Sequence, residues 1–400
     1  MRQYESYKDS GVEWLGEVPS HWELGRISTY FTERRTKVSD KDYPALSVTK
    51  LGVFPQWENV AKTNDGDNRK LAKKGDFVIN SRSDRKGSSG IAKQDGSVSL
   101  INIVLQPKKI NSVYSEYLFK SYSFIEEFYR VGHGIVADLW TTRFEDIKNS
   151  LIIFPPLSEQ QKIAQFLDDK TAKIDQAVDL AEKQIVLLKE HKQILIQNAV
   201  TRGLNPDVPL KDSGVEWIGQ VPEHWGVKKL KFVLTLSNKK EESKNSNKRY
   251  IGMENIESFT GKINDIPLIA EGIANSFYKD EILFGKLRPY LAKSYLADFD
   301  GICSTEFLVY RSTKVLNNRF ALNIFLSYGF IDAVNASTYG SKMPRANAEF
   351  ISNIFLAIPP LLEQKQIIDY LDKQTAKIDQ AIALKTAHIE KLKEYKSVLI

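Results

Sequence analysis

The chain has 400 residues, of which 42% are hydrophobic and 26% charged, a balance that is typical of globular proteins and excludes a disordered chain. No stretch approaches the roughly 20 consecutive apolar residues of a membrane helix, and the N-terminus lacks a signal peptide's apolar segment, so we expect a cytoplasmic protein. The single cysteine, Cys303, excludes an intramolecular disulfide, and the net charge of +6 permits nucleic-acid binding without requiring it.

The first recognisable element is a box at residues 8–22, which recurs as residues 211–225 with 12 of its 15 positions identical. A second block at residues 155–177 recurs as residues 359–381, at an offset of 204. The long stretches between box and block show no comparable identity, and a period near 200 is too long for a solenoid. The sequence therefore predicts a duplicated domain pair. We expect the repeated box and block to form a shared scaffold, and the two diverged stretches between them to perform two versions of one task.

The variable stretch after each box combines strand-like runs with apolar-rich helices, which predicts mixed α/β domains with an irregular sheet. The expected elements are strands at residues 76–80, 97–105, 281–285 and 305–310, and helices at residues 114–129 and 319–328.

Each repeated block opens a long helix with one apolar stripe. In the first copy, apolar residues three and four apart run from Ile163 to Leu195, and Gly203 ends a helix of about 40 residues, or ~60 Å. Ser158 and Gln161 resemble a capping box at its start. So narrow a stripe is stable only when covered, so we expect the two helices to pair as a coiled coil. We favour antiparallel helices, because a globular domain must connect the end of one to the start of the next.

The second helix is shorter than the first. It stops at Ile400, which corresponds to Ile196, whereas the first copy continues for about two turns to Gly203. A natural end and a truncation would both produce this difference.

Motifs of catalysis are missing from the sequence. It has neither a Walker A loop nor a dinucleotide-binding glycine loop, and its histidines do not show metal-ligand spacing. His21 and His224 occupy the same position of the repeated box, each before a tryptophan, which favours a packing or capping role over catalysis. Cys303 stands next to a strand-like run and is expected to be a small core residue and not a nucleophile. We therefore expect a binding protein without chemistry of its own.

Basic loops follow strands at matching places in both repeats. Residues 81–90 form a basic loop rich in serine and glycine, and residues 285–290 stand at the corresponding place. Residues 338–347 form a further basic loop, with a counterpart at residues 132–143. An exposed turn explains each loop alone, but the recurrence favours DNA contact through phosphates and base edges. The predicted DNA-binding residues are Ser81, Arg82, Ser83, Arg85, Lys86, Lys286, Arg288, Tyr290, Lys342 and Arg345.

The repeated array resembles the specificity subunit of a type I restriction-modification system. The resemblance rests on the boxes DSGVEWLG…P.HW and DSGVEWIG…P.HW and on the blocks PPL.EQ that open the long helices. Residues 283–291 and 303–307 are also similar to a recurrent target-recognition segment of that family, whereas residues 81–90 depart from the family pattern.

The resemblance implies a division of labour that matches the repeat. Each variable region would be a target recognition domain that reads one half of a bipartite, asymmetric DNA site. The helices would set the gap between the halves and dock two modification subunits, which carry S-adenosylmethionine and methylate adenine N6. Restriction subunits that use ATP and Mg²⁺ would join them, and the chain itself would bind no cofactor or metal.

The implied architecture is α+β, with two mixed α/β target recognition domains and two long helices packed as an antiparallel coiled coil in a pseudo-twofold tandem repeat. The expected boundaries are 1–154 for the first recognition domain, 155–203 for the central helix, 204–358 for the second recognition domain and 359–400 for the C-terminal helix. Two alternatives remain open from the residues alone. One is a coiled-coil assembly adaptor whose variable domains bind protein, and the other is an autonomous methyltransferase or nuclease, for which every cofactor and metal motif is missing.

Overall fold

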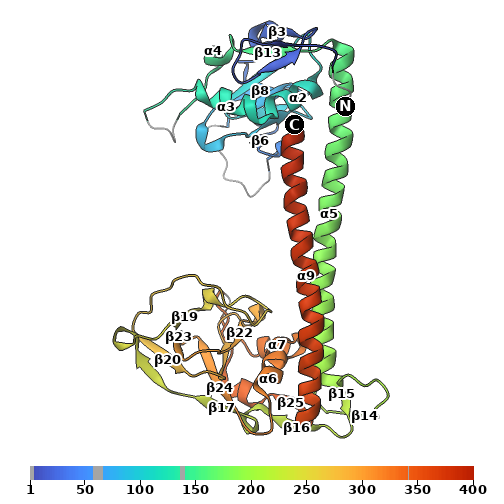
Figure 1. Cartoon of the computed structure of the whole chain (residues 1–400). Helices are drawn as coiled ribbons and strands as arrows, with labels where there is room; N and C mark the ends of the chain where they lie inside the picture. Colours follow the sequence, from blue (N-terminus) through green and yellow to red (C-terminus); the bar gives the residue numbers. More distant parts are fainter. Residues whose placement is uncertain (1–3, 57–65, 136–139, 341) are drawn as a thin grey trace. The chain divides into compact units, whose positions relative to one another are not determined.

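The computed structural model describes residues 4–56, 66–135, 140–340 and 342–400. The chain divides into two compact units, the first made of residues 1–180 and 387–400 and the second of residues 181–386. Each unit holds one mixed α/β domain and parts of the two long helices, α5 (Leu157–Arg202) and α9 (Leu361–Leu399) (Figure 1). Among the described residues, none of the helices combines the length and apolar composition needed to cross a bilayer.

The first unit is built around two small sheets, with strand orders β10-β9-β12-β4 and β11-β8-β5. The box forms the hairpin β1–β2, and β3 pairs with β13 just before α5. The aromatic side chains of Phe31, Phe77 and Phe119 fill the core between the larger sheet and the helices. The strands are β1 (Tyr7–Asp9), β2 (Glu17–Pro19), β3 (Glu23–Arg26), β4 (Phe31–Glu33), β5 (Lys37–Val38), β6 (Leu46–Thr49), β7 (Gly52–Pro55), β8 (Arg69–Ala72), β9 (Phe77–Asn80), β10 (Ser89–Ile91), β11 (Gly96–Val98), β12 (Asn102–Pro107) and β13 (Leu151–Phe154). The short helices are α1 (Ile27–Tyr30), η1 (Ser83–Arg85), α2 (Ser112–Lys120), α3 (Tyr122–Arg130) and α4 (Phe144–Ile147).

The second unit repeats this plan with two four-stranded sheets, β17-β24-β21-β22 and β18-β20-β23-β19. Its box forms the hairpin β14–β15, and β16 pairs with β25 just before α9. The strands are β14 (Leu210–Asp212), β15 (Gln220–Pro222), β16 (Gly226–Lys229), β17 (Leu234–Ser237), β18 (Lys240–Glu242), β19 (Tyr250–Ile251), β20 (Ile273–Phe277), β21 (Ile282–Gly285), β22 (Ser294–Leu296), β23 (Gly301–Cys303), β24 (Phe307–Ser312) and β25 (Phe355–Ile358). The helices are η3 (Leu230–Phe232), η4 (Ser243–Asn245), η5 (Met253–Asn255), η6 (Pro289–Leu291), α6 (Asn318–Phe325), α7 (Tyr328–Asn335) and α8 (Ala348–Asn353).

The structure breaks three elements that the sequence suggests are continuous. The expected strand at residues 97–105 is split, because a turn closed by the Asn102 amide on the Ser99 carbonyl places β11 and β12 in different sheets. The expected helix at residues 114–129 is split at Ser121, whose extended backbone and hydroxyl cap α3. The expected helix at residues 319–328 likewise ends at Phe325, before α7.

The predicted capping role of Ser158 is wrong. Helix α5 begins at Leu157, and the carbonyl of Pro156 accepts the first helical hydrogen bond, from the Gln160 amide at 3.0 Å. Ser158 therefore lies inside the first turn, whereas a capping side chain belongs to the residue that precedes the helix.

The box and the start of the long helix are joined in the same way in both units. In the first unit, the ring nitrogens of His21 and Trp22 lie 3.0 and 2.9 Å from a carboxylate oxygen of Glu159. In the second unit, His224 and Trp225 contact Glu363 at 2.6 and 2.9 Å. Both repeated histidines therefore bind a glutamate in the first turn of a long helix, and their side chains remain about half exposed.

The two long helices run antiparallel, as predicted. In the second unit, Gln184 of α5 contacts Lys385 of α9, and Lys192, further along α5, contacts Asp379, which lies earlier in α9. In the first unit, Asp175 accepts from Lys396 at 2.6 Å. Most of the predicted apolar stripe is turned inward, with Leu167, Ile174, Ile378 and Ile389 buried. Cys303 is buried in β23, where desolvation raises the pKa of its thiol, as fits a core residue.

Candidate DNA-binding surface

In the first unit, the loop after β9 is held beside the loop before α4. The Ser83 amide donates to the Trp140 carbonyl at 3.0 Å, and the Thr142 amide donates to the Ser81 carbonyl at 2.9 Å. Thr141 in turn pairs with His133. The structure thus brings together two loops that the sequence predicts separately, although residues 136–139 of the second loop lie outside the described residues.

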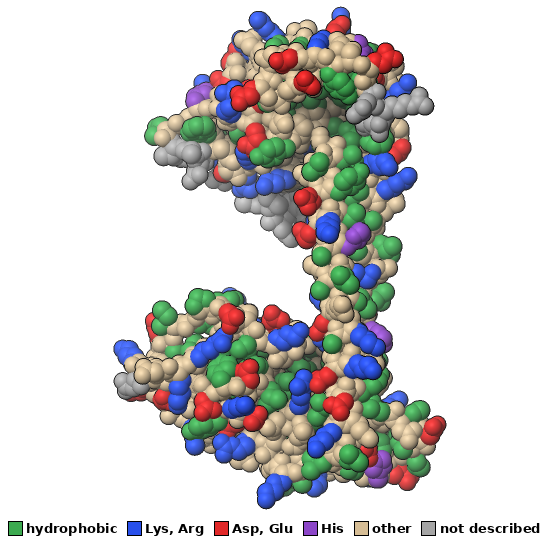
Figure 2. Space-filling model, viewed as in Figure 1, with side chains coloured by type: hydrophobic (Ala, Val, Ile, Leu, Met, Phe, Trp, Pro, Cys, Tyr) green, Lys and Arg blue, Asp and Glu red, His purple; other side chains and the backbone are tan. Residues whose placement is uncertain are grey.

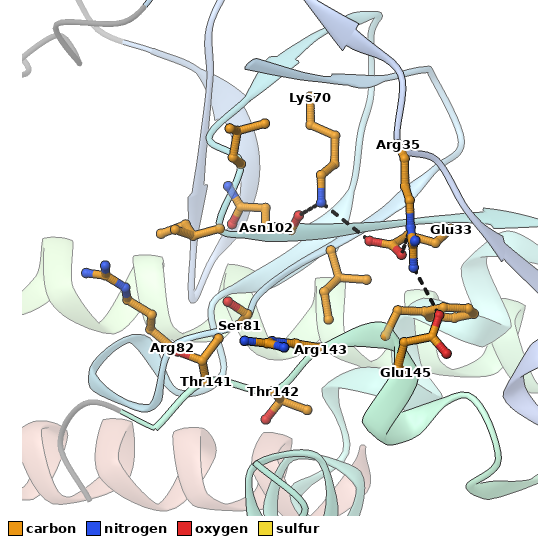
Figure 3. Close-up of a pocket in the computed structure, with 14 residues that line it drawn as sticks. Glu33, Arg35, Lys70, Ser81, Arg82, Asn102, Thr141, Thr142, Arg143 and Glu145 are labelled. Carbon is orange, nitrogen blue, oxygen red and sulfur yellow. Dashed lines mark hydrogen bonds and ion pairs between the residues drawn. The ribbon is translucent and has the colours of Figure 1, made fainter. Parts of the chain in front are cut away.

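These loops border a cavity of about 460 Å³. Some basic side chains in its wall are ion-paired, and others have no ion-pair partner among the described residues. Lys70 and Arg35 contact the carboxylate of Glu33 at 3.4 and 2.5 Å, and Arg35 also reaches Glu145 at 3.1 Å (Figure 3). Burial lowers the pKa of Lys70 and Glu33 opposes this shift. Arg82 and Arg143 line the same cavity, yet neither is ion-paired within the described residues. Their charges remain available to an anion.

The other predicted residues of the first loop are less open. Ser81 lines the cavity but is only 3% exposed. Lys86 pairs with Glu126 at 2.7 Å, and the Arg85 guanidinium lies 3.7 Å from Asp84. Ser83 starts the short helix η1. Arg143 was not among the predicted site residues, although its loop was predicted. Its exposure beside Arg82 becomes visible only when the two loops are paired.

In the second unit, the loop after β21 is paired in the same way with the loop before α8. The Arg288 amide donates to the Pro344 carbonyl at 2.7 Å, and the Ala346 amide donates to the Lys286 carbonyl at 2.9 Å. Arg288 adopts a left-handed backbone conformation, with φ of 51°, at the start of η6. This uncommon conformation for an arginine reflects a loop fixed by its surroundings.

Four of the predicted DNA-binding residues lie on these paired loops of the second unit. Arg288, Tyr290 and Lys342 are exposed and Lys286 is half-exposed, and none of the three basic side chains forms an ion pair in the described part of the chain. Arg345 is different. Its guanidinium binds the carboxylate of Glu306 at 3.0–3.2 Å, which raises the pKa of Arg345 and fixes the loop that carries Lys342. Ser341, in the same loop, lies outside the described residues.

The comparisons with known proteins place this arrangement in a family. The family model described as the type I restriction modification DNA specificity domain matches the chain twice, at residues 20–184 and 222–394. The chain belongs to this family. Both matches contain a box tryptophan, the paired loops and the start of a long helix.

The chain is also similar in sequence to proteins described as type I restriction enzyme specificity subunits. The chain is 27% identical over 254 residues to the type I restriction enzyme EcoDI specificity subunit of Escherichia coli, a match that covers 58% of this chain and 57% of that protein. It is 24% identical over 416 residues to the type I restriction enzyme MjaVIII specificity subunit of Methanocaldococcus jannaschii, covering 96% and 92% of the two chains.

Solved structures share the fold. A chain from a study of complex assembly and conformational transition of the type I R-M system superposes with a TM-score of 0.70 at 14% identity, covering 96% of this chain and 97% of that one. The HsdS subunit from Thermoanaerobacter tengcongensis gives a TM-score of 0.55 at 14% identity, covering 96% of each. The predicted fold class and the assignment as a type I specificity subunit with two recognition domains are confirmed. The findings do not support the adaptor alternative.

Proposed function

We propose that each recognition domain reads one half of a bipartite, asymmetric double-stranded DNA site through its paired loops. The observation that carries this proposal is the recurrence of the loop pairing at matching places in two domains whose sequences have diverged. Because the loop pairing is the same, we expect both domains to contact DNA through these loops. Because the side chains on the loops differ, we expect the two domains to recognise different bases.

The basic side chains without an ion-pair partner among the described residues differ between the two sets of paired loops, as two different half-sites would require. Arg82 and Arg143 project from the first joint, and Lys286, Arg288 and Lys342 from the second. An arginine fork can bind guanine O6 and N7 together, whereas a lysine supplies a point charge for a phosphate or a single acceptor. The two domains therefore carry different sets of donors, which favours an asymmetric site.

The helices, we propose, set the gap between the half-sites and dock two modification subunits. Apolar side chains are exposed at equivalent positions of both repeats: Leu180 and Leu384 are 57% and 66% exposed, and Ile194 and Val398 are 56% and 79% exposed. Figure 2 shows hydrophobic side chains at the surface along the helices. Exposed apolar groups that recur at repeat positions are typical of a surface that binds the same partner twice.

The partners would supply the chemistry. Modification subunits would carry S-adenosylmethionine and methylate adenine N6 at the site that this chain selects, and restriction subunits would use ATP and Mg²⁺. The chain would direct both reactions without a catalytic group of its own.

Sequencing of methylated adenines tests the proposal. The chain is expressed with its modification subunits as wild type, as the double variant Lys286→Ala/Arg288→Ala, and as Arg82→Ala/Arg143→Ala. We expect each double variant to lose or relax one half of the methylated motif and to retain the other half. Lys109→Ala and Lys314→Ala, which remove exposed lysines from outside the paired loops, serve as controls with an unchanged motif. An unchanged motif in both double variants would refute the site assignment.

A further inference from the structure

Lys70 lies in the wall of the cavity beside the paired loops of the first unit (Figure 3). Its side chain is 11% exposed and belongs to β8, in the smaller of the two sheets. The ammonium donates to the Asn102 carbonyl at 2.6 Å and contacts the Glu33 carboxylate at 3.4 Å. An ammonium carries three N–H groups, so these contacts within the described part of the chain leave one for a molecule that enters the cavity.

The second unit carries an asparagine, Asn275 of β20, at the equivalent position. Strand β8 lies between β5 and β11, and strand β20 lies between β18 and β23. Lys70 faces Lys37 on β5, just as Asn275 faces Lys240 on β18. The register of the two sheets therefore matches Lys70 with Asn275, although the two side chains differ in charge and length.

The two side chains form the same hydrogen bond. Lys70 donates to the carbonyl of Asn102, the first residue of β12, and the Asn275 amide donates at 2.9 Å to the carbonyl of Phe307, the first residue of β24. This bond lies beside the paired loops in both units, since Asn102 is in the cavity wall and Phe307 faces Gly285, the last residue before the loop after β21. The bond is thus part of the shared scaffold, whereas the identity of its donor is not.

The hydrogen-bonding groups that this bond leaves over differ between the units. Lys70 retains one N–H and its positive charge, which suit an acceptor such as guanine O6 or N7. Asn275 is half-buried, and within the described residues it retains one N–H and its Oδ1. An amide that offers a donor and an acceptor together matches N7 and the N6 amino group of adenine.

We propose that Lys70 and Asn275 are equivalent specificity-determining residues, Lys70 for a guanine in the first half-site and Asn275 for an adenine in the second. The inference rests on the proposed function and extends it from the paired loops to the strands beside them. The cavity of about 460 Å³ admits the edge of a base to Lys70. Arg82 and Arg143 in the same wall are placed to bind the phosphates that flank this base.

Exchange of the two residues tests the proposal. The chain is expressed with its modification subunits, and methylated adenines are mapped by sequencing. Lys70→Asn introduces a side chain that forms the scaffold bond in the second unit, and Asn275→Lys is the reciprocal change. We expect Lys70→Asn to replace a guanine by an adenine at one position of the half-site that Arg82→Ala/Arg143→Ala alters. Asn275→Lys should make the opposite change in the other half-site.

A wild-type first half-site without a G·C pair, or a second without an A·T pair, would overturn the proposal at once. So would an unchanged motif in both exchange variants. Lys73→Met, which removes an exposed lysine that follows β8, is the matched control and should leave the motif unchanged.

Lys70→Met separates a base contact from a phosphate contact, because it removes the N–H groups and nearly keeps the length of the side chain. Fluorescence anisotropy with the modification subunits present compares DNA duplexes that differ only at the position assigned to Lys70. We expect the preference for guanine there to fall about tenfold, with the other positions unaffected. A uniform loss for all sequences, with a salt slope lower by about 1, would assign Lys70 to a phosphate and overturn the proposal.

Two further outcomes distinguish this inference from the function on which it rests. Weaker methylation of an unchanged motif by Lys70→Asn, with lower stability in urea, would show that Lys70 only supports the fold, and would overturn the inference. If Arg82→Ala/Arg143→Ala alters the motif and Lys70→Asn does not, the inference fails while the recognition function stands. If neither variant alters the motif, recognition through the first paired loops fails as well.

Discussion

The two units use the same contacts between box, long helix and paired loops, but different side chains lie on their surfaces. In each, the box binds the first turn of a long helix through one glutamate, and two loops meet beside the sheet through backbone hydrogen bonds. In the first, Arg82 and Arg143 stand beside a network of Lys70, Arg35 and Glu33, whereas in the second a left-handed Arg288 stands beside the Arg345–Glu306 ion pair. Backbone bonds fix a position without fixing side chains. Recognition can therefore diverge while the scaffold stays the same.

The largest expected effect concerns the buried glutamine at the start of each long helix. Gln364 accepts from the Asn317 amide at 2.7 Å and donates to the carbonyls of Val315 and Pro359. Gln160 makes two such bonds, with the Asn111 amide and the Pro155 carbonyl. Because buried backbone groups lose their partners, we expect Gln364→Ala to lower the free energy of unfolding by about 3 kcal/mol and Gln160→Ala by about 2 kcal/mol.

Urea unfolding of the chain measures both values. Gln161→Ala and Gln366→Ala, which change exposed glutamines in the first two turns of the same helices, provide the matched controls. If Gln160→Ala destabilised the chain as much as Gln364→Ala, the number of bonds would not explain the difference between the joints.

The next effect concerns the Arg345–Glu306 ion pair in the paired loops of the second unit. Glu306→Gln removes the charge that fixes Arg345, so we expect DNA carrying the methylated motif to bind about tenfold more weakly, or ~1.4 kcal/mol. Glu145→Gln, which changes the first cavity, leaves Arg82 and Arg143 unaffected and should change affinity by less than about twofold. Fluorescence anisotropy with the modification subunits present measures both. Equal losses of DNA affinity in Glu306→Gln and Glu145→Gln would contradict the special role of the Arg345–Glu306 ion pair.

A smaller effect separates free cations from paired ones in the first unit. If Arg82 contacts a phosphate, Arg82→Ala should lower the slope of log affinity against log salt by about 1. Arg35→Ala should leave the slope nearly unchanged, because Glu33 and Glu145 already neutralise that guanidinium. Titrations between low and moderate salt give the slopes. A larger change for Arg35→Ala than for Arg82→Ala would reverse the assignment.

The smallest effect is the pH dependence of stability that Tyr117 contributes in the first unit. Tyr117 donates to Asp168, and burial followed by that carboxylate raises the pKa of Tyr117 to about 12. A pKa above the unfolded value gives stability that is present below pH ~10 and lost as the pH rises through 12. Tyr117→Phe should therefore flatten the loss of stability between about pH 10 and 12, measured by urea unfolding. In the second unit, Arg319 contacts the equivalent Asp372 at 3.0 Å. Arg319→Gln, which adds no group that titrates between pH 10 and 12, should leave that pH profile unchanged.

The sequence predicts the scaffold well because the scaffold is repeated. The box, the block and the helical stripe recur as patterns, so the long helices and their antiparallel pairing could be inferred before the structure. The break at Ser121 could not, because an apolar helical period continues through a residue whose hydroxyl caps a new helix. The exposure of Arg143 and the burial of Ser81 depend on long-range loop pairing, which leaves no local signal in the sequence.

Replacement of one recognition domain by the other tests the central claim most directly. In this chain, residues 226–355 are exchanged for residues 23–150, and methylated adenines are mapped by sequencing after expression with the modification subunits. If each domain reads its own half-site and the helices set the gap, the methylated motif should contain the half-site of the first domain twice, with an unchanged gap. A motif that still contained the half-site of the second domain would contradict the account.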